Sequence, residues 1–290
     1  MSKIEIEITN ELEDEFEKYL IDLEESINTI KQYQYSLKTY KKEIGNKLSK
    51  QNLKQYKDIL LNKRKPKTVN VRIAGIIKFI KFYAEYKKDK RYEEIIIKNI
   101  KMQNKTYLNN VISLDEFKKM YEYCKDNNQE KYYYIIKFMG YTGARISEVV
   151  KCDKKSVEQG YMEIISKGNK FRRIYIPQNF QRELLNWIKS LNIEGYIFKN
   201  KNGQVITTRG ISQQLKRIAN ILKINDKKVH PHSFRHLFAI EFLKNNKDIT
   251  LLADLLGHSN LDTTKIYLRR TEEEQIKKYG GFYVGRYEAG

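Results

Sequence analysis

Helical periodicity along almost the whole chain is the feature that most restricts how this sequence folds. Only three prolines interrupt its 290 residues, and proline is the residue that the interior of a helix tolerates least. Apolar residues recur at helical spacing in EDEFEKYLIDLEES and NTIKQYQYSLKTYKKEI, and TVNVRIAGIIKFIKFYAEYKK carries one broad apolar stripe. The sequence therefore predicts a mainly α protein in which residues 1–95 form an all-helical domain.

One central stretch departs from this pattern. YMEIISKGNKFRRIYIP contains two β-rich runs around a Gly-Asn turn, which is typical of a hairpin, and we expect the polar residues 166–173 at its tip. Ser113 and Glu116 have capping-box spacing at the start of a new helix. Residues 111–278 are thus predicted to be an α+β domain with a small antiparallel sheet, and the basic segment 96–110, which lacks a clear period, is interpreted as a linker.

Charge is distributed unevenly along the chain. The net charge is +20, but residues 1–25 contain ten acids and only two lysines, so the remainder carries +28. A polyanion is the natural partner of such a protein, and nucleic acid is the first choice. The alternative is a Lys-rich proteome encoded by an AT-rich genome. No apolar run reaches the roughly 20 residues of a membrane span, and the N-terminus lacks the layout of a signal peptide. We expect a cytoplasmic, nucleoid-associated protein with no membrane partner.

Three of the four histidines, His230, His232 and His236, lie together in VHPHSFRHLFAIEFLKNN. A metal site, a nucleophilic enzyme and a phosphate site are all open from this segment alone. No cysteine or carboxylate stands at metal-ligand spacing with these histidines, and HExxH is absent. Motifs of nucleotide hydrolases and of GxSxG enzymes are absent as well. Cys124 and Cys152 are too few for a disulfide framework or a structural zinc site. We expect no metal and no cofactor.

The remaining unusual patterns contain residue types suited to phosphate chemistry. Arginine forks match phosphate oxygens bidentately, histidine accepts or donates a proton near neutral pH, and a tyrosine hydroxyl attacks phosphorus once its proton is lost or shared. The guanidinium pair neutralises developing charge, so no metal is required. The set comprises Arg145 in YTGARISEVV, Lys167 in SKGNKFRR, His232 and Arg235 one helical turn apart in HSFRH, His258 in LLGHSNLDTTKIYL, and Tyr267 nine residues later.

Each of these residues also has a structural interpretation. Tyr267 is one of 22 tyrosines and by itself would be a packing residue. Arg145 could form a surface ion pair with Glu148, and His258 could cap a helix end. His236 is interpreted as a packed or supporting histidine, and His230 as part of a loop.

Taken together, the motifs resemble the tyrosine recombinases, also called the phage integrase family. The resemblance runs through TGARISEV, SKGNK, HSFRH with FA after it, and LLGHSNLDTTKIYL, in this order and at these intervals, over about residues 110 to 270. Each motif is weakly specific alone, but the ordered set is strongly specific. In the N-terminal part, NTIKQYQYSLKTY and TVNVRIAGIIKFIKFYAEYKK are similar to segments of the family's helical core-binding domain.

The resemblance implies a mechanism. Tyr267 would be the nucleophile that forms a 3′-phosphotyrosyl link and frees a 5′-hydroxyl, while Arg145 and Arg235 would clamp the scissile phosphate. Lys167, which has rivals on the same hairpin, would protonate the leaving 5′-oxygen. The histidines would assist: His232 as a base or hydrogen-bond donor, and His258 by holding the phosphate or the nucleophile. The bond energy is stored in the covalent intermediate, so ATP would not be needed.

Residues that contact DNA outside the site are harder to identify, since a solvated helix face has the same composition. Much of the affinity should come from phosphate contacts and depend on salt. The candidates are Arg72 and Lys78 on the predicted fourth helix, Lys170 and Arg172 on the hairpin, and Arg209 and Ser212 near a predicted helix start.

The functional expectation is a site-specific recombinase acting on double-stranded DNA. It would work as a homotetramer on two recombination sites, with an accessory DNA-bending or directionality protein as a further partner. Residues 279–290 are expected to be a tail that docks on a neighbouring protomer, the alternative being a tail packed in cis or disordered. The rival functions are a topoisomerase-like nicking-closing enzyme and a non-catalytic DNA-binding regulator.

Overall fold

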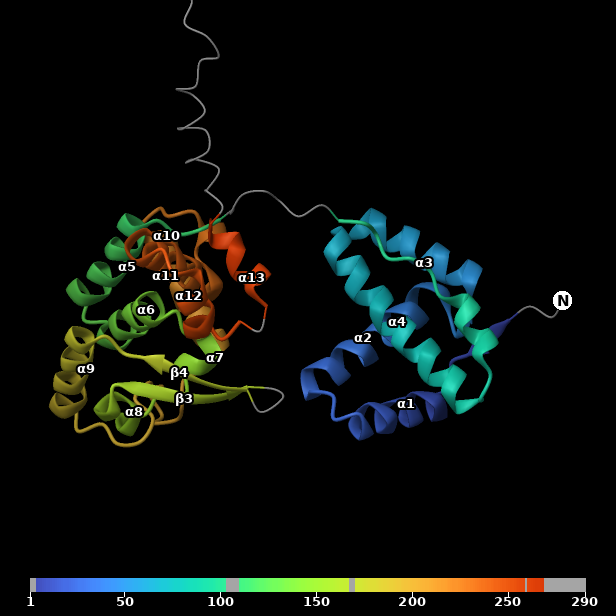
Figure 1. Cartoon of the computed structure of the whole chain (residues 1–290), viewed down its shortest axis with the longest axis horizontal. Coiled ribbons are helices and arrows are strands. Elements are labelled where there is room, and N and C mark those ends of the chain that lie inside the picture. Colours follow the sequence, from blue (N-terminus) through green and yellow to red (C-terminus); the bar gives the residue numbers. More distant parts are fainter. Residues whose placement is uncertain (1–3, 103–109, 167–169, 259, 269–290) are drawn as a thin grey trace, which may run out of the picture. The chain divides into compact units, whose positions relative to one another are not determined.

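The chain divides into two compact units, residues 1–104 and 105–290, and each has its own hydrophobic core. Within the described residues, no helix is both long and apolar enough to cross a membrane. The computed structural model describes residues 4–102, 110–166, 170–258 and 260–268 (Figure 1).

The first unit is mainly a set of helices whose starts are fixed by local side chains. The hydroxyls of Thr9, Ser26 and Ser49 each accept a backbone N–H at the start of a helix. Pro66 begins the longest helix, where its missing N–H has no cost. The elements are β1 (Glu5–Glu7), α1 (Asn10–Asp22), α2 (Ile27–Ile44), β2 (Lys47–Ser49), α3 (Lys50–Lys63), α4 (Pro66–Tyr86) and the 3-10 helix η1 (Lys90–Ile95).

Helix α4 organises the core of this unit. Its apolar stripe is buried, and the ring of Phe79 packs edge-on against Phe16 of α1 with 5.2 Å between the ring centroids. Gly75 lets α4 approach α2 closely, because a Cβ at that position would lie 2.6 Å from the hydroxyl oxygen of Ser36. The apolar stripe read from the sequence is therefore the face that holds the unit together.

The first unit also contains strands, although the sequence predicted an all-helical domain. β1 pairs antiparallel with β2, with Ile6 opposite Leu48. Ile6 and Ile8 are buried while Glu7 between them is exposed, which is the alternation of a strand that has one face on a core. The prediction of a purely helical domain is wrong in this detail, because the alternating residues IEIEI were too few to stand out from the adjacent helix.

The beginning of the segment interpreted as a linker packs on the first unit. Ile97 is buried in the core of this unit. The side-chain amide of Asn70 on α4 donates to the carbonyl oxygen of Ile100 at 2.9 Å and accepts from its N–H at 2.8 Å. Residues 96–100 are therefore held against α4.

The second unit is built around helix α6, which contacts α5 on one side and α11 on another (Figure 1). Its core is rich in aromatic residues, among them the fully buried Phe117, Phe138 and Phe234. The elements are α5 (Leu114–Asp126), α6 (Glu130–Thr142), α7 (Ile146–Val149), α8 (Lys154–Gln159), β3 (Tyr161–Ser166), β4 (Lys170–Tyr175), α9 (Gln178–Ser190), α10 (Thr208–Ile221), η2 (Asp226–Lys228), α11 (Pro231–Asn246), α12 (Ile249–Leu256), α13 (Leu261–Lys265) and η3 (Ile266–Leu268).

Two local predictions for this unit can be compared with the structure. The capping box at Ser113 and Glu116 is present with both of its hydrogen bonds. The hairpin is also present, but its tip is shorter than the predicted 166–173, since Ser166 pairs with Lys170. The polar residues after the turn continue β4, because backbone pairing does not depend on side-chain polarity and alternate residues of β4 face the core.

A smaller apolar cluster links the end of α11 to α12 and η3. It contains Ala239, Leu243, Leu252, Leu256 and Tyr267. Tyr267 is thus fixed by packing against the second half of α11 and against α12. The architecture, mainly helical with small antiparallel sheets, agrees with the predicted fold class.

Candidate active site

Arg145 is presented at the point where α6 ends and α7 begins. Gly143 terminates α6 in the left-handed region, with φ of 64°. A Cβ there would lie 2.5 Å from the ring of Phe238 on α11, so only glycine fits. Arg145 is the N-terminal cap of α7, and its guanidinium donates to Glu148 at 3.0 Å with about a third of the side chain still exposed.

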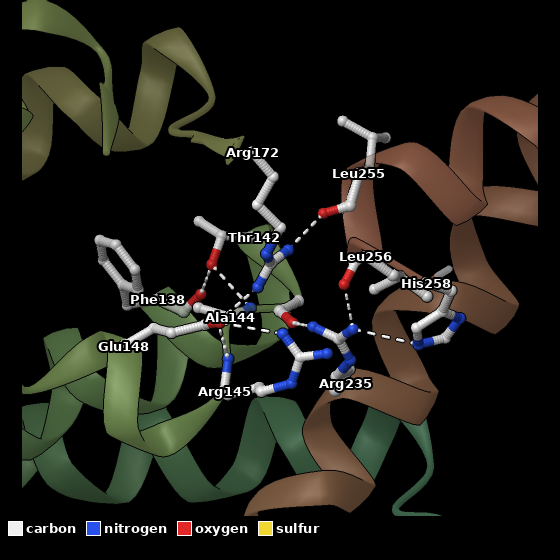
Figure 2. A network of polar contacts seen from close by, with 11 residues as sticks. Phe138, Thr142, Ala144, Arg145, Glu148, Arg172, Arg235, Leu255, Leu256 and His258 are labelled. Carbon is white, nitrogen blue, oxygen red and sulfur yellow. Dashed lines mark hydrogen bonds and ion pairs between the residues drawn. The ribbon is translucent and has the colours of Figure 1, made fainter. Parts of the chain in front are cut away.

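Glu148 joins Arg145 to the hairpin. Its buried carboxylate also accepts from the backbone N–H of Arg145 at 2.7 Å and from the guanidinium of Arg172 at 2.5 Å (Figure 2). Burial alone would raise the pKa of Glu148, but the hydrogen bonds from Arg172 and Arg145 outweigh it and lower that pKa. Glu148 therefore stays ionised and orients Arg145. The ion pair between Arg145 and Glu148, considered as a structural alternative, is present together with an open part of the guanidinium.

Arg172 lies in a different place from the exposed position expected for a DNA contact. Its side chain is buried, and besides Glu148 it donates to the carbonyl oxygen of Leu255 at 2.6 Å. Gly257 makes room for it, since a Cβ there would lie 2.2 Å from Cδ of Arg172. Arg172 alternates inward with Ile174 on β4, so it connects the hairpin to α7 and α12 rather than facing solvent.

Arg235 lies on α11 with 3% of its surface exposed. It donates to the carbonyl oxygens of Gly143, at 2.8 Å, and Leu256, and it lies 3.1 Å from Nε2 of His258 (Figure 2). None of these partners within the described residues carries a charge. Burial, with Arg145 and Arg172 nearby, lowers the pKa of Arg235 to about 10. The site holds a buried cation whose partners are dipoles, which suits an incoming anion.

His258 follows Gly257, the left-handed end of α12. Its Nε2 faces the Arg235 guanidinium, which only donates, so Nε2 is the acceptor and the proton resides on Nδ1. Nδ1 then donates to the hydroxyl of Thr264 at 2.8 Å. Burial, followed by the charges of Arg235 and Arg145, lowers the pKa of His258 to about 4, so the ring is neutral and both of its nitrogens are engaged.

Tyr267 completes the group from η3. Its side chain is buried, and its ring lies nearly parallel to that of His258, with 6.4 Å between the centroids and an angle of 14°. Its hydroxyl oxygen is 3.1 Å from Nδ1 of His236. Burial raises the pKa of Tyr267, while the charges of Arg235 and Arg145 oppose this.

The histidines at the start of α11 lie in different environments. His232 is exposed, and its ring centroid is 6.5 Å from that of His236, one turn further along α11. Partial covering of its ring, followed by the charges of Arg235 and Arg145, lowers the pKa of His232. His230, interpreted as loop, caps α11 instead: its Nδ1 accepts the N–H of Ser233 at 3.1 Å.

The structure brings together five of the six predicted catalytic residues and adds one that was not predicted. Arg145, His232, Arg235, His258 and Tyr267 are linked through the contacts above or share the face of α11. Lys167 lies outside the described residues, as does the predicted tail 279–290. His236, expected to be mainly structural, touches the Tyr267 hydroxyl. Its position four residues after His232, on the same helix face, was the available signal.

The other residues predicted to contact DNA lie on α4, β4 and α10. On α4, Arg72 stacks over the Tyr35 ring at 4.2 Å, and the Lys78 amine is 5.2 Å from the ring centre of Tyr19. Arg209 is exposed in the first turn of α10. Ser212 donates its hydroxyl to the carbonyl oxygen of Thr208 at 2.9 Å, and Lys170 is the first residue of β4.

Metal-ligating side chains do not gather in the described part of the chain: it contains no group of three or more His, Cys, Asp or Glu placed to hold a metal ion. Arginine, histidine and tyrosine side chains cluster where α7, α11, α12 and η3 meet in the second unit. Such a cluster suits nucleophilic attack by a tyrosine on a bound phosphodiester.

Comparison with known proteins identifies the family. Residues 110–274 match the phage integrase family, so the chain belongs to that family, and the predicted class of protein, a tyrosine recombinase, is confirmed. The chain is 26% identical to tyrosine recombinase XerD of Staphylococcus epidermidis, over 92% of this chain and 97% of that protein. It is 28% identical to tyrosine recombinase XerA of Pyrococcus furiosus, over 91% of each.

Solved structures share the fold. The XerH recombinase bound to its difH substrate aligns with a TM-score of 0.67 and 22% identity, over 92% of this chain and 83% of that one. A lambda integrase fragment in a dimer bound to a COC′ core site aligns with a TM-score of 0.73 and 14% identity, over 97% and 99%. The predicted fold, a helical N-terminal part followed by an α+β part, is confirmed.

Proposed function

We propose that the protein is a site-specific DNA recombinase that cleaves and rejoins strands through a 3′-phosphotyrosyl intermediate on Tyr267. The observation that carries this proposal is the buried guanidinium of Arg235, which has neutral partners and whose charge opposes the rise in the pKa of Tyr267. A phosphodiester there would supply the missing negative charge and place phosphorus beside the nucleophile. The XerH and lambda integrase structures, both with DNA, support DNA as the partner.

The chemistry assigned to this chain follows from its residues. Arg145 and Arg235 bind the non-bridging oxygens of the scissile phosphate, and Glu148 and Arg172 hold Arg145 in place. The Tyr267 oxygen attacks phosphorus, and the bond to the 5′-oxygen breaks. Lys167, proposed from its motif, gives that oxygen its proton.

Two histidines, His232 and His258, assist in binding the phosphate. His232 is exposed beside the site and hydrogen-bonds the phosphate once DNA is bound. His258 orients Arg235 through its Nε2. Attack on the phosphotyrosine by a 5′-hydroxyl of another strand exchanges the strands, and no cofactor takes part.

The assembly proposed is a homotetramer on two recombination sites in cytoplasmic DNA, with an accessory DNA-bending or directionality protein. Residues 1–95 act as the core-binding domain, 96–110 as the linker, 111–278 as the catalytic domain, and 279–290 as the tail that docks on a neighbour. Exposed or half-exposed basic residues supply phosphate contacts. They are Arg72, Lys78 and Arg209, with Ser212 beside the last of these, and Lys170 at the start of β4 is proposed from its sequence position.

The test uses a duplex selected by binding from a pool of random sequences. A nick placed in it lets the short fragment diffuse away after cleavage and traps the covalent adduct. Wild type should give an adduct on a denaturing gel, and Tyr267→Phe should give none while still binding. Tight binding without an adduct in either protein would reject the proposal, and an adduct in Tyr267→Phe would reject the chosen nucleophile.

A second assay separates recombination from simple nicking and closing. Two labelled duplexes carrying the selected site should exchange strands, with four protomers in the complex by native mass. Relaxation of supercoiled plasmids regardless of sequence, without exchange, would favour the topoisomerase-like alternative.

A further inference from the structure

A ring nitrogen of His236 lies within hydrogen-bond distance of the Tyr267 hydroxyl oxygen, the atom proposed to attack phosphorus. Nδ1 of His236 is 3.1 Å from the Tyr267 hydroxyl oxygen, and the two ring centroids are 5.4 Å apart at 55°. His236 comes from α11 and Tyr267 from η3, 31 residues later. Tyr267 is held in its small apolar cluster, and the His236 ring lies beside the rings of His232 and Tyr267, with centroids 6.5 and 5.4 Å away. The contact between His236 and Tyr267 is therefore set by the packing of α11 and η3.

The direction of this hydrogen bond follows from the charge of Arg235. The positive guanidinium acts on the Tyr267 oxygen and favours its ionised form. A cation attracts the lone pairs of the phenol oxygen, so the phenol proton points away from Arg235. Nδ1 of His236 lies 3.1 Å from that oxygen and accepts this proton, which places the His236 proton on Nε2.

The other two histidines beside the site are poorly placed to take this proton. Both nitrogens of His258 are engaged, Nε2 by Arg235 and Nδ1 by Thr264. His232 lies on the exposed side of His236 and has no hydrogen bond to Tyr267 among the contacts of the described residues. Of these three histidines, His236 is the one with a ring nitrogen placed to accept the proton of the Tyr267 hydroxyl.

The surroundings keep His236 neutral until the substrate arrives. Burial, followed by the charges of His232, His230, Arg235 and His258, lowers the pKa of His236 to about 4. A neutral imidazole accepts a proton, whereas an imidazolium does not. A phosphate bound by Arg235 would offset that positive charge and make proton uptake by His236 easier.

We infer that His236 is a catalytic residue of this protein, the base that removes the proton of the Tyr267 hydroxyl during strand cleavage and returns it during strand joining. The inference rests on the proposed function. As the bond between the tyrosine oxygen and phosphorus forms, the O–H bond breaks and its proton passes to Nδ1, giving an imidazolium. The bond from phosphorus to the 5′-oxygen breaks, and that oxygen takes a proton from the general acid. In joining, the imidazolium protonates the departing tyrosine oxygen.

The first measurement is single-turnover cleavage of the nicked duplex by His236→Ala and His236→Asn. General base catalysis contributes roughly 10²- to 10⁴-fold, so we expect His236→Ala to cleave at least about 10²-fold more slowly. His236→Asn keeps an acceptor oxygen near the Nδ1 position but takes no proton, so its rate should stay close to that of the alanine variant. His230→Ala is the matched control, because it removes a histidine that caps the same helix without touching Tyr267.

The second measurement separates proton transfer from support of the site. A half-site whose 3′-phosphate is esterified with p-nitrophenol joins to a 5′-hydroxyl strand without Tyr267, and its leaving group departs without a proton. In a Tyr267→Phe background, His236→Ala should leave this joining rate unchanged within about threefold, because only steps at the tyrosine oxygen need the base. External imidazole should also restore part of the cleavage by His236→Ala.

The outcomes are distinguishable from failure of the proposed function. If wild type forms no adduct, the recombinase proposal itself fails. If wild type cleaves but His236→Asn cleaves equally fast, His236 only positions the hydroxyl and the inference is wrong. If His236→Ala slows the p-nitrophenyl joining reaction as much as cleavage, the residue supports the fold of the site and the inference is again wrong.

Discussion

Two buried cations in the second unit, Lys137 and Arg235, are surrounded in opposite ways. Lys137 on α6 is 4% exposed, and its amine pairs with the Glu183 carboxylate and donates to the Tyr133 hydroxyl at 2.9 Å. The rings of Tyr133 and Phe180 also face it, with centroids 4.7 and 5.4 Å away. Arg235 is as deeply buried, but the partners described for it are carbonyl oxygens and a neutral imidazole.

The difference separates a structural cation from one that serves a reaction. Burial lowers the pKa of Lys137, but its hydrogen bonds to Glu183 and Tyr133 outweigh burial, and the net pKa is raised. For Arg235, burial and two neighbouring arginines lower the pKa to about 10. The fold therefore compensates the charge of Lys137 internally and leaves that of Arg235 to be compensated by a ligand.

The largest effect is expected for Arg235→Met. Removing one preorganised donor from a charged transition state costs about 10²- to 10³-fold in rate, and loss of the buried charge brings the expected decrease in cleavage of the nicked duplex to about 10³-fold. The free energy of unfolding should change little, since an uncompensated charge is removed together with its hydrogen bonds.

Anion binding provides the matched control for this variant. Inorganic sulfate should raise the melting temperature of wild type and of Lys137→Met more than that of Arg235→Met, because a ligand stabilises only the state that binds it. The general effect of sulfate on burial is shared by all three proteins. Equal stabilisation of all three would show that Arg235 does not require an anion.

The second effect concerns the ion pair of Lys137 and Glu183, in which removing either partner should change the free energy of unfolding by a different amount. Glu183→Ala leaves a buried ammonium without its counter-charge and should lower the free energy of unfolding by about 3 kcal/mol, the lower end for such pairs, because the Tyr133 hydroxyl remains. Lys137→Met removes the buried charge, while Glu183 is 42% exposed and is solvated, so the loss should stay under about 1 kcal/mol. Urea unfolding of both variants tests this asymmetry, and equal losses would contradict it.

The sequence predicts features that depend on neighbouring residues and misses those that depend on residues far apart in the chain. The capping box at Ser113 and the left-handed end of α6 at Gly143 depend on residues within one turn, and both are legible in the sequence. The strand at Ile6 was not, because its partner lies about forty residues away and its alternation spans only a few residues. Similarly, Arg172 was expected to face DNA, since nothing local reveals that it reaches Glu148 and the end of α12.

The site shows the same limit. The spacing of HSFRH predicts that His232, Arg235 and His236 share a helix face, but it does not say what lies opposite. Only the packing of η3 brings the Tyr267 hydroxyl to His236 rather than to His232. Residue types and order were therefore sufficient to predict the chemistry, while the assignment of the proton acceptor required the tertiary structure.

A third effect is the pH dependence of the free energy of unfolding, which we expect to come from the histidines of the site and not from Lys137. The pKa values of His236 and His258 are lowered to about 4 in the folded protein, against about 6.5 when unfolded. Between these values the unfolded chain binds more protons, so the free energy of unfolding decreases as pH falls from 6.5 toward 4. Discounted for partial exposure, the loss from about pH 7 to about pH 5 should be on the order of 2 kcal/mol.

Urea unfolding at the two pH values measures this loss, and the double variant His236→Asn, His258→Asn is the comparison. Carboxylates contribute equally to both proteins, so the difference between them isolates the histidines. The double variant should retain its stability better at low pH. An identical loss in both proteins would mean that burial and the positive charge around Arg235 do not suppress protonation of these rings.

The smallest effect concerns the glycine whose carbonyl oxygen holds Arg235. Gly45 and Gly143 both have positive φ, 102° and 64°, but a Cβ at Gly45 meets nothing within 4 Å, whereas one at Gly143 collides with Phe238. Gly45→Ala should cost roughly 1 to 3 kcal/mol for backbone strain alone, because φ of 102° with ψ of −170° is a conformation that glycine almost alone adopts. Gly143→Ala should cost about 1 to 2 kcal/mol for its left-handed backbone and about 1 kcal/mol more because Phe238 must shift.

Cleavage by the two alanine variants then shows whether the neutral partners of Arg235 matter for function. Moving the Gly143 carbonyl displaces the guanidinium that it accepts from, so Gly143→Ala should slow cleavage about tenfold or more, while Gly45→Ala should cleave at the wild-type rate. If Gly143→Ala lost stability but cleaved normally, the carbonyl oxygens would be packing partners of Arg235 and would not position it for phosphate.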